Sequence, residues 1–120
     1  MKTSKDPRHL KRRQAVQEIF AWQFSTEGVV LGELATQVVE NLNDIDGKVA
    51  IAAPNRPIHQ INRIDLAILR LALFELVQKK TPTKVVVDEA VELAKEFGSD
   101  ASPSFINGAL GNIITVLEKN

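Results

Sequence analysis

The amino-acid sequence predicts an all-α protein, a compact helical bundle of about five to seven helices. Apolar residues recur three and four positions apart through most of the 120 residues, the spacing that gives a helix one apolar face. The alternation typical of a half-buried strand is absent, and the one strand-like run, at 85–87, leads directly into a helical pattern. Apolar residues make up 44% and charged residues 25%, as in ordinary folded proteins. We therefore expect one domain over residues 1–120 and no sheet.

The first helix is expected at Pro7–Phe24, because proline is tolerated in a first turn and Ala15 and Ile19 begin an apolar stripe. Gly28 interrupts the periodic pattern after this helix. The pattern resumes over 31–45, where leucines, valines and an isoleucine return at helical spacing. A second amphipathic helix is therefore predicted there.

The middle of the chain contains its clearest break. Asparagine, aspartate and glycine at 43–47 are expected to interrupt or end the second helix, and a short helical turn is expected around 49–51. Residues 54–57, Pro-Asn-Arg-Pro, then enforce a loop, because each proline also pushes its predecessor away from helical geometry. Residues 61–78 follow and are apolar on almost every face, which is typical of a central, buried helix.

Two further helices complete the predicted bundle. The first runs near 85–97 and ends at Gly98, where we expect a left-handed C-terminal cap. The second starts at Ser102-Pro103, since serine is a good N-cap and proline suits the first turn.

The charge of the chain is unevenly distributed although its formal net charge is zero. Residues 1–13 carry six cations against Asp6 alone, a net charge of +5, so the rest of the chain carries −5. A basic arm on an acidic body favours contact with a polyanion at one end. A solvated terminus is the alternative.

The sequence shows no machinery for catalysis. It has no cysteine and only two histidines, fifty positions apart, so no metal site is expected. The carboxylates of 88–96 follow helical spacing and are typical of a solvated helix face. No phosphate-binding glycine loop or nucleophile elbow is present. We predict no enzyme activity, no cofactor and no small-molecule substrate.

No export signal or membrane span is expected either. The cationic start is followed by an amphipathic stretch where a signal peptide needs an apolar block. The longest apolar run, 66–77, is interrupted by Arg70 and Glu75 and is too short to cross a bilayer. The cytoplasm is the expected compartment.

RNA is the ligand that the remaining features favour. Cations on the first helix are expected to be solvated, Arg12 and Arg13 among them, and to meet phosphates, while an exposed aromatic ring could stack on an unpaired base. Phe105, at a helix start, has two interpretations: packing in the core, which is favoured from the residues alone, or contact with a base.

Five segments resemble the NusB family of transcription antitermination factors. They are RRQAVQ at 12–17, FAWQ at 20–23, IDLAILRLALFEL at 64–76, VDEAVELAK at 87–95 and FINGAL at 105–110. The resemblance implies a fold of two packed helical subdomains. It also implies binding of boxA-type, single-stranded RNA together with NusE, a ribosomal small-subunit protein, in the transcription elongation complex, in support of ribosomal RNA operons.

The resemblance also implies site residues. RNA contacts fall on the first helix and at the start of the last one: Arg8, Lys11, Arg12, Arg13, Gln23 and Phe105. The surface that faces NusE falls at the entry to the central helix: His59, Gln60 and Asp65. In this interpretation Phe105 becomes an RNA contact rather than a core residue.

Two departures from the family pattern bear on these implications. The stretch before Leu31 is shorter than is usual in the family, and Ala101 stands where relatives often have an acid. The first keeps open a helical adaptor that binds protein and has lost RNA binding. The fold also resembles the N-terminal domain of ribosomal RNA cytosine methyltransferases, although no catalytic cysteine is present here.

Overall fold

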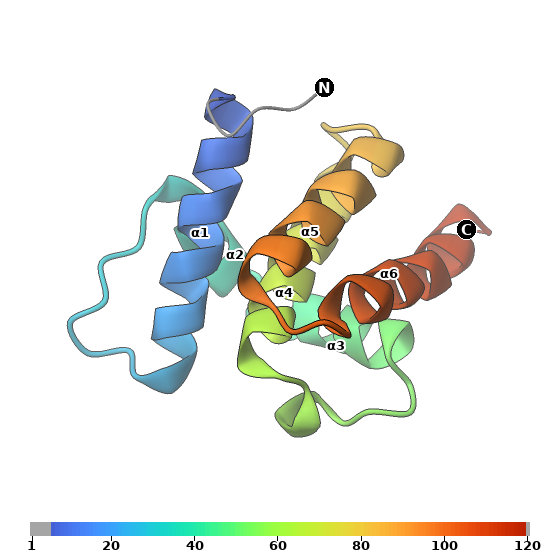
Figure 1. Cartoon of the computed structure of the whole chain (residues 1–120), viewed down its shortest axis with the longest axis horizontal. Helices are drawn as coiled ribbons and strands as arrows, with labels where there is room; N and C mark the ends of the chain where they lie inside the picture. The colour runs from blue at the N-terminus through green and yellow to red at the C-terminus, as the bar shows by residue number, and fades with distance from the viewer. Residues whose placement is uncertain (1–5, 120) are drawn as a thin grey trace.

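Helix α4 (Arg63–Gln78) runs through the middle of the molecule in the computed structural model, which describes residues 6–119. Eleven of its sixteen residues are buried, as its apolar sequence predicts. Helices α1, α2, α3, α5 and α6 all pack against α4 (Figure 1). Their bounds, with that of the short 3-10 helix η1, are α1 Pro7–Phe24, α2 Glu33–Glu40, α3 Leu42–Ala52, η1 Ile58–Gln60, α5 Thr83–Phe97 and α6 Ser102–Glu118.

The all-α prediction is confirmed, and no strand occurs among residues 6–119. Helices α1 and α2 pack on each other at one side of α4, and α5 and α6 pack on each other at another side, with α3 joining α2 to α6 (Figure 1). The aliphatic core between them is nearly inaccessible to solvent, with Ile19, Leu69 and Leu110 at 0% exposed. No helix in the described part of the chain is long and apolar enough to span a membrane.

Helix α1 has the predicted bounds, and its start has a clear chemical cause. The Asp6 carboxylate accepts a hydrogen bond from the Arg8 backbone N–H at 2.9 Å, which caps the helix, and Pro7 follows in the first turn. The Arg8 side chain also bonds to this carboxylate, with Nη2 to Oδ2 at 3.2 Å. These bonds from Arg8 lower the pKa of Asp6.

The interruption or end of the second helix predicted at 43–47 does not occur there. The chain breaks at Asn41 instead, where the backbone leaves helical geometry and the side-chain amide donates to the Gln37 carbonyl at 2.8 Å. Helix α3 then continues through Gly47, because Ile45 and Val49 lie on one helical face and are buried against the core. Burial of that face outweighs the weak helix propensity of a single glycine, about 1 kcal/mol.

Gly98 does not form the predicted left-handed cap. Its φ is −92° and its ψ is −169°, an extended conformation open to any residue. Space explains the glycine instead: a Cβ there would collide with the Ser102 side chain and lie 2.8 Å from the Ala94 carbonyl oxygen. Ser102 is likewise not the N-cap, which is Ala101, but a buried first-turn residue whose hydroxyl accepts from the Ser99 N–H at 2.9 Å.

Gly98→Ala is expected to destabilise the protein by about 1–3 kcal/mol, because overpacking forces the α5–α6 connection to move. Gly111→Ala is the matched control. Its Cβ meets nothing within 4 Å on α6, so the higher helix propensity of alanine should stabilise the protein by about 0.5–1 kcal/mol. Chemical denaturation of both variants measures the difference, and equal stabilities would refute the packing explanation.

Candidate nucleic-acid interface

Arg12 is a buried structural cation, and the expectation that it is solvated is wrong. Only 7% of the residue is exposed, on the side of α1 that faces α4 and α5. Its Nε lies 2.9 Å from Glu75 Oε2 and its Nη2 lies 2.8 Å from Glu75 Oε1, a two-point pairing, while Glu89 lies 3.7 Å from Nη1. The hydrogen bond to Glu75 raises the pKa of Arg12. This guanidinium has no free face for a phosphate.

Two more residues of α1 face carboxylates of α5. His9 Nδ1 lies 3.0 Å from Glu89 Oε2, and both side chains are almost fully buried. Arg13, which is partly exposed, pairs closely with Glu96 and lies 5.2 Å above the Phe97 ring. The basic stretch of α1 therefore packs against acidic side chains of α4 and α5, which compensate most of its charge within the fold.

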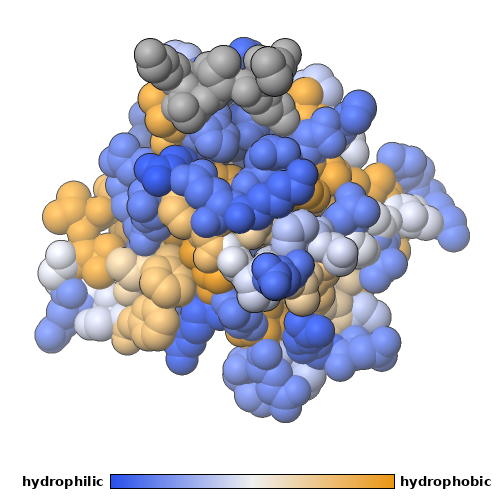
Figure 2. Space-filling view, viewed as in Figure 1, coloured by the Kyte–Doolittle hydropathy of each residue, from blue (hydrophilic) through white to orange (hydrophobic). Residues whose placement is uncertain are grey.

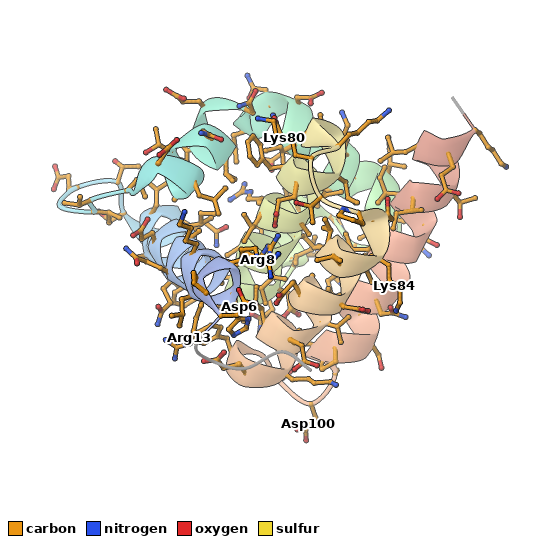
Figure 3. The ribbon with its side chains drawn as sticks, turned by 90° about the horizontal axis from the view of Figure 1, so that it is seen from above. Asp6, Arg8, Arg13, Lys80, Lys84 and Asp100 are labelled. Atoms are coloured by element: carbon orange, nitrogen blue, oxygen red, sulfur yellow. The ribbon has the colours of Figure 1, made fainter. Side chains whose placement is uncertain are left out.

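Arg8 and Lys11 are the α1 cations that remain open to solvent. Among residues 6–119, the Arg8 side chain, which is 81% exposed, forms an ion pair only with Asp6, the cap of its own helix, and the exposed Lys11 forms none. Both lie near the start of α1, and Figure 3 shows Arg8 beside Asp6 at that end, with Arg13 farther along the helix. Of the predicted phosphate contacts, these two have the required exposure.

Gln23 joins the end of α1 to α4. Its amide donates to the Arg63 carbonyl at 2.8 Å, and its Oε1 accepts from Arg70 Nη1 at 2.9 Å. Arg70 in turn makes a two-point pair with Asp46 at 2.9 Å, which ties α3 to the same cluster. Every polar atom of the Gln23 side chain thus has a partner within the fold, so its predicted role as an RNA contact competes with a structural one.

Phe105 lies in the first turn of α6 and is half-buried, with one face covered by a side chain from the distant loop after α3. The Arg56 guanidinium lies 4.3 Å from the centre of the Phe105 ring. Both residues line a cavity of about 280 Å³ together with Asn55 and Asn112. A flat ring, a flat cation and two amides therefore converge at one opening.

The residues predicted to face NusE separate into two groups. His59 and Gln60 are exposed on η1, as a contact surface requires. Asp65 is only 4% exposed, and its Oδ1 has no hydrogen-bond partner in the described structure. A partner cannot contact the Asp65 carboxylate unless the start of α4 moves.

Arg56 is the site residue that sequence reasoning missed. It stands in the Pro-Asn-Arg-Pro loop, whose proline pattern predicts a turn but does not indicate which distant residue the arginine contacts.

No group of three or more metal-ligating side chains comes together within residues 6–119.

Sequence comparison extends the likeness of this chain to whole proteins. Residues 24–115 match the model of the NusB family. A protein of Chloroflexus aggregans named transcription antitermination protein NusB is 52% identical over 79 residues, which cover 63% of this chain and 53% of that protein. A protein of the same name from Psychromonas ingrahamii is 36% identical over 98% of this chain and 94% of its own length. In the match to the Chloroflexus aggregans protein and in three others like it, the chain spans about half the length of the relative.

Structural comparison gives the same result. T. maritima NusB superimposes with a TM-score of 0.75 at 29% identity, covering 96% of this chain and 93% of that one. A chain in a crystal structure described as a plectonemic RNA supercoil shares the fold, with a TM-score of 0.82 at 17% identity. The family model covers well over half of the chain, so this protein belongs to the NusB family.

Proposed function

We propose that the protein is an antitermination factor that binds boxA-type, single-stranded RNA together with NusE in the transcription elongation complex, acting in the cytoplasm in support of ribosomal RNA transcription. The observation that carries this proposal is the pairing of Phe105 with Arg56 beside an open cavity. Membership of the NusB family and the antitermination names of the relatives support it.

The Phe105 opening has the chemistry that an unpaired base requires. Base stacking on an aromatic ring contributes roughly 1–3 kcal/mol, and an arginine plane stacks in the same way. Arg56 is exposed, so it can move aside to admit a base or remain stacked on its outer face. Asn55 supplies an amide that can hydrogen-bond to a base edge, and Asn112, whose Nδ2 already donates to the Ala52 carbonyl at 3.0 Å, adds its side-chain oxygen as an acceptor.

We place the phosphate contacts on Arg8 and Lys11, since Arg12 and Arg13 are engaged by Glu75 and Glu96. Two phosphates neutralised by α1 predict a weaker salt dependence than four solvated cations would give. The NusE-facing surface is proposed at His59 and Gln60, both exposed on η1.

A protein-binding adaptor is the second candidate. The acids that oppose α1 favour it, because Glu75, Glu89 and Glu96 cancel much of the positive potential that attracts RNA. An adaptor would bind NusE without binding RNA at any salt concentration, so the two candidates separate in one titration.

Replacing Arg8 and Lys11 together with serine should reduce the salt dependence of RNA binding. Each phosphate contact on a single strand contributes about 0.7 to the log–log slope, so the double variant should lose roughly 1.4 units. The melting temperature should change little, because both side chains are exposed and the Arg8 backbone N–H that Asp6 caps is retained. Fluorescence anisotropy with a boxA-type oligonucleotide across a salt series measures the slope.

Lys48→Ser is the matched control for that titration, since Lys48 pairs with Asp44 on α3. Its slope should equal that of the unaltered protein. A salt response that is flat in the unaltered protein would refute RNA binding through α1, and an unchanged slope in the double variant would place the phosphates elsewhere.

A further inference from the structure

A groove lies between the turn that joins α4 to α5 and the C-terminal half of α6. Its volume is about 640 Å³, and its floor is aliphatic, formed by Leu76, Ile114 and Leu117. These three side chains also pack against the core, so the floor is held by the fold rather than by a loop. This surface is separate from the Phe105 opening, because the two cavities share no residue.

The rim of the groove is cationic. Lys79 and Lys80 line it, are exposed, and form no ion pair with any residue of the described chain. Lys84 is the second residue of α5. Its side chain is 86% exposed, and among residues 6–119 its ion pair is with Asp88 on the same helix. In Figure 3, Lys80 lies toward the top of the view and Lys84 toward its right side, so the two side chains extend in different directions. Glu118 is the only acid that lines the groove.

The cations of this region differ from the others in the acidic body. Arg56 covers Phe105, Arg70 pairs with Asp46, and Lys48 pairs with Asp44. Lys79 and Lys80, by contrast, are adjacent exposed lysines that have no carboxylate partner among residues 6–119. Their positive charge is therefore available to a partner.

The backbone at Lys79 strengthens this inference. Lys79 caps the end of α4 with φ 58°, the left-handed conformation in which glycine is favoured and a side chain is strained. A lysine at this position makes the fold less stable than a glycine would. Strain of this kind points to a role for the side chain outside the fold.

We propose that this groove binds a short acidic, amphipathic peptide segment of a protein partner. Apolar side chains of the peptide cover the aliphatic floor, and its carboxylates face Lys79 and Lys80. Helix α5 begins beside the rim without a side-chain cap, since its N-cap residue is Pro82, so its N-terminal dipole adds to the attraction for carboxylates. RNA fits less well, because no aromatic ring lines the groove to stack a base.

The test uses the full chain, isotope-labelled for NMR, titrated with a short peptide in which glutamates alternate with leucines. We expect shifts of the backbone amides at 79–81, 83–84 and 114–118. Anisotropy with a fluorescein-labelled form of the peptide then gives the affinity. Replacing the glutamates of the peptide with lysines, or its leucines with serines, should abolish the response, because each removes one half of the complementarity.

Lys79→Gly tests the rim without harming the fold. Glycine suits the left-handed position, so the melting temperature should hold or rise, whereas the affinity for the peptide should fall about two- to five-fold through loss of one surface ion pair. Adding Lys80→Ser should bring the loss to as much as about twenty-fold. Lys95→Gln, which removes an exposed lysine on α5 paired with Glu92, is the control and should leave affinity unchanged.

Three outcomes would overturn the proposal. The peptide could leave the amides at 79–81, 83–84 and 114–118 unmoved, or bind Lys79→Gly and the unaltered chain equally well. A single-stranded RNA could also shift these amides more strongly than the peptide, which would make the groove an extension of the RNA surface. Loss of RNA binding through Arg8, Lys11 or Phe105 would leave the peptide result unaffected, so this proposal and the proposed function fail separately.

Discussion

Glu75→Ala is expected to destabilise the protein by about 3–5 kcal/mol, because it leaves the Arg12 guanidinium buried without its principal partner. Only 7% of Arg12 is exposed, so water cannot replace the carboxylate, and Glu89 at 3.7 Å is already bound to His9. Arg12→Ala should have a similar effect, because it removes the cation that lies between the carboxylates of Glu75 and Glu89 and leaves both buried without it. Urea denaturation measures both.

Arg13→Ala is the matched control, one residue away on the same helix. Its side chain is partly exposed where it pairs with Glu96, so the expected loss is below about 1 kcal/mol. A second variant, Arg12→Leu combined with Glu75→Leu, should recover much of the stability, because a buried pair replaced by apolar residues is often neutral. Equal, small effects at Arg12 and Arg13 would show that α1 is the solvated basic helix that its sequence suggests.

The position of Arg12 could have been predicted from spacing. Arg12 lies three and four residues before Ala15 and Val16, which places it on the apolar stripe of α1 rather than on the opposite face. Glu75 lies four residues after the buried Leu71, on the same face of a helix that is mostly buried. A cation and an acid that lie on the apolar stripes of two helices are expected to pair. The net charge of residues 1–13 does not show this, because it does not record which helix face each residue occupies.

Helix existence follows from periodicity, whereas helix ends depend on local contacts. Helix α1 has its predicted bounds because Asp6 and Pro7 determine its start in the sequence itself. The break at Asn41 and the extended Gly98 depend on what lies nearby in the fold: a helix face buried through Gly47, and the Ser102 side chain beside position 98. Periodicity along the sequence does not indicate which distant residues will contact these positions in the fold.

The Phe105 site shows the same division. The start of a helix at 102–105 is predictable from Ser102 and Pro103, but the stacking of Arg56 on the ring depends on how the loop after α3 returns to α6.

The exposure of apolar side chains also depends on the fold. Val30, in the connection between α1 and α2, is 85% exposed. Figure 2 shows apolar surface at the edge of the molecule where Figure 1 places that connection.

Phe105→Ala is expected to weaken RNA binding about five- to a hundred-fold, which corresponds to the roughly 1–3 kcal/mol of one stacked base. Its cost in stability should stay below the 3–5 kcal/mol typical of a fully buried phenylalanine, because the ring is only half-buried. Binding is measured by anisotropy with a boxA-type oligonucleotide, and stability by thermal denaturation.

Ile106 is the internal control for Phe105, since it is the next residue on α6 and is 0% exposed. Ile106→Ala should cost about 2–5 kcal/mol of stability, whereas the folded fraction should bind RNA normally. The two neighbouring variants should thus show opposite patterns. Early melting of Phe105→Ala, with normal RNA binding by its folded fraction, would return Phe105 to the core and leave only α1 as the RNA surface.

The claim that a base stacks on Phe105 is tested most directly by photo-crosslinking with an RNA that carries iodouridine, which reacts with an aromatic ring stacked on it. After irradiation and digestion, mass spectrometry should find the crosslink on the peptide that contains Phe105, and the yield should fall to background in Phe105→Ala. Crosslinks that map only to other parts of the chain, or a yield unchanged by the substitution, would contradict the proposed site.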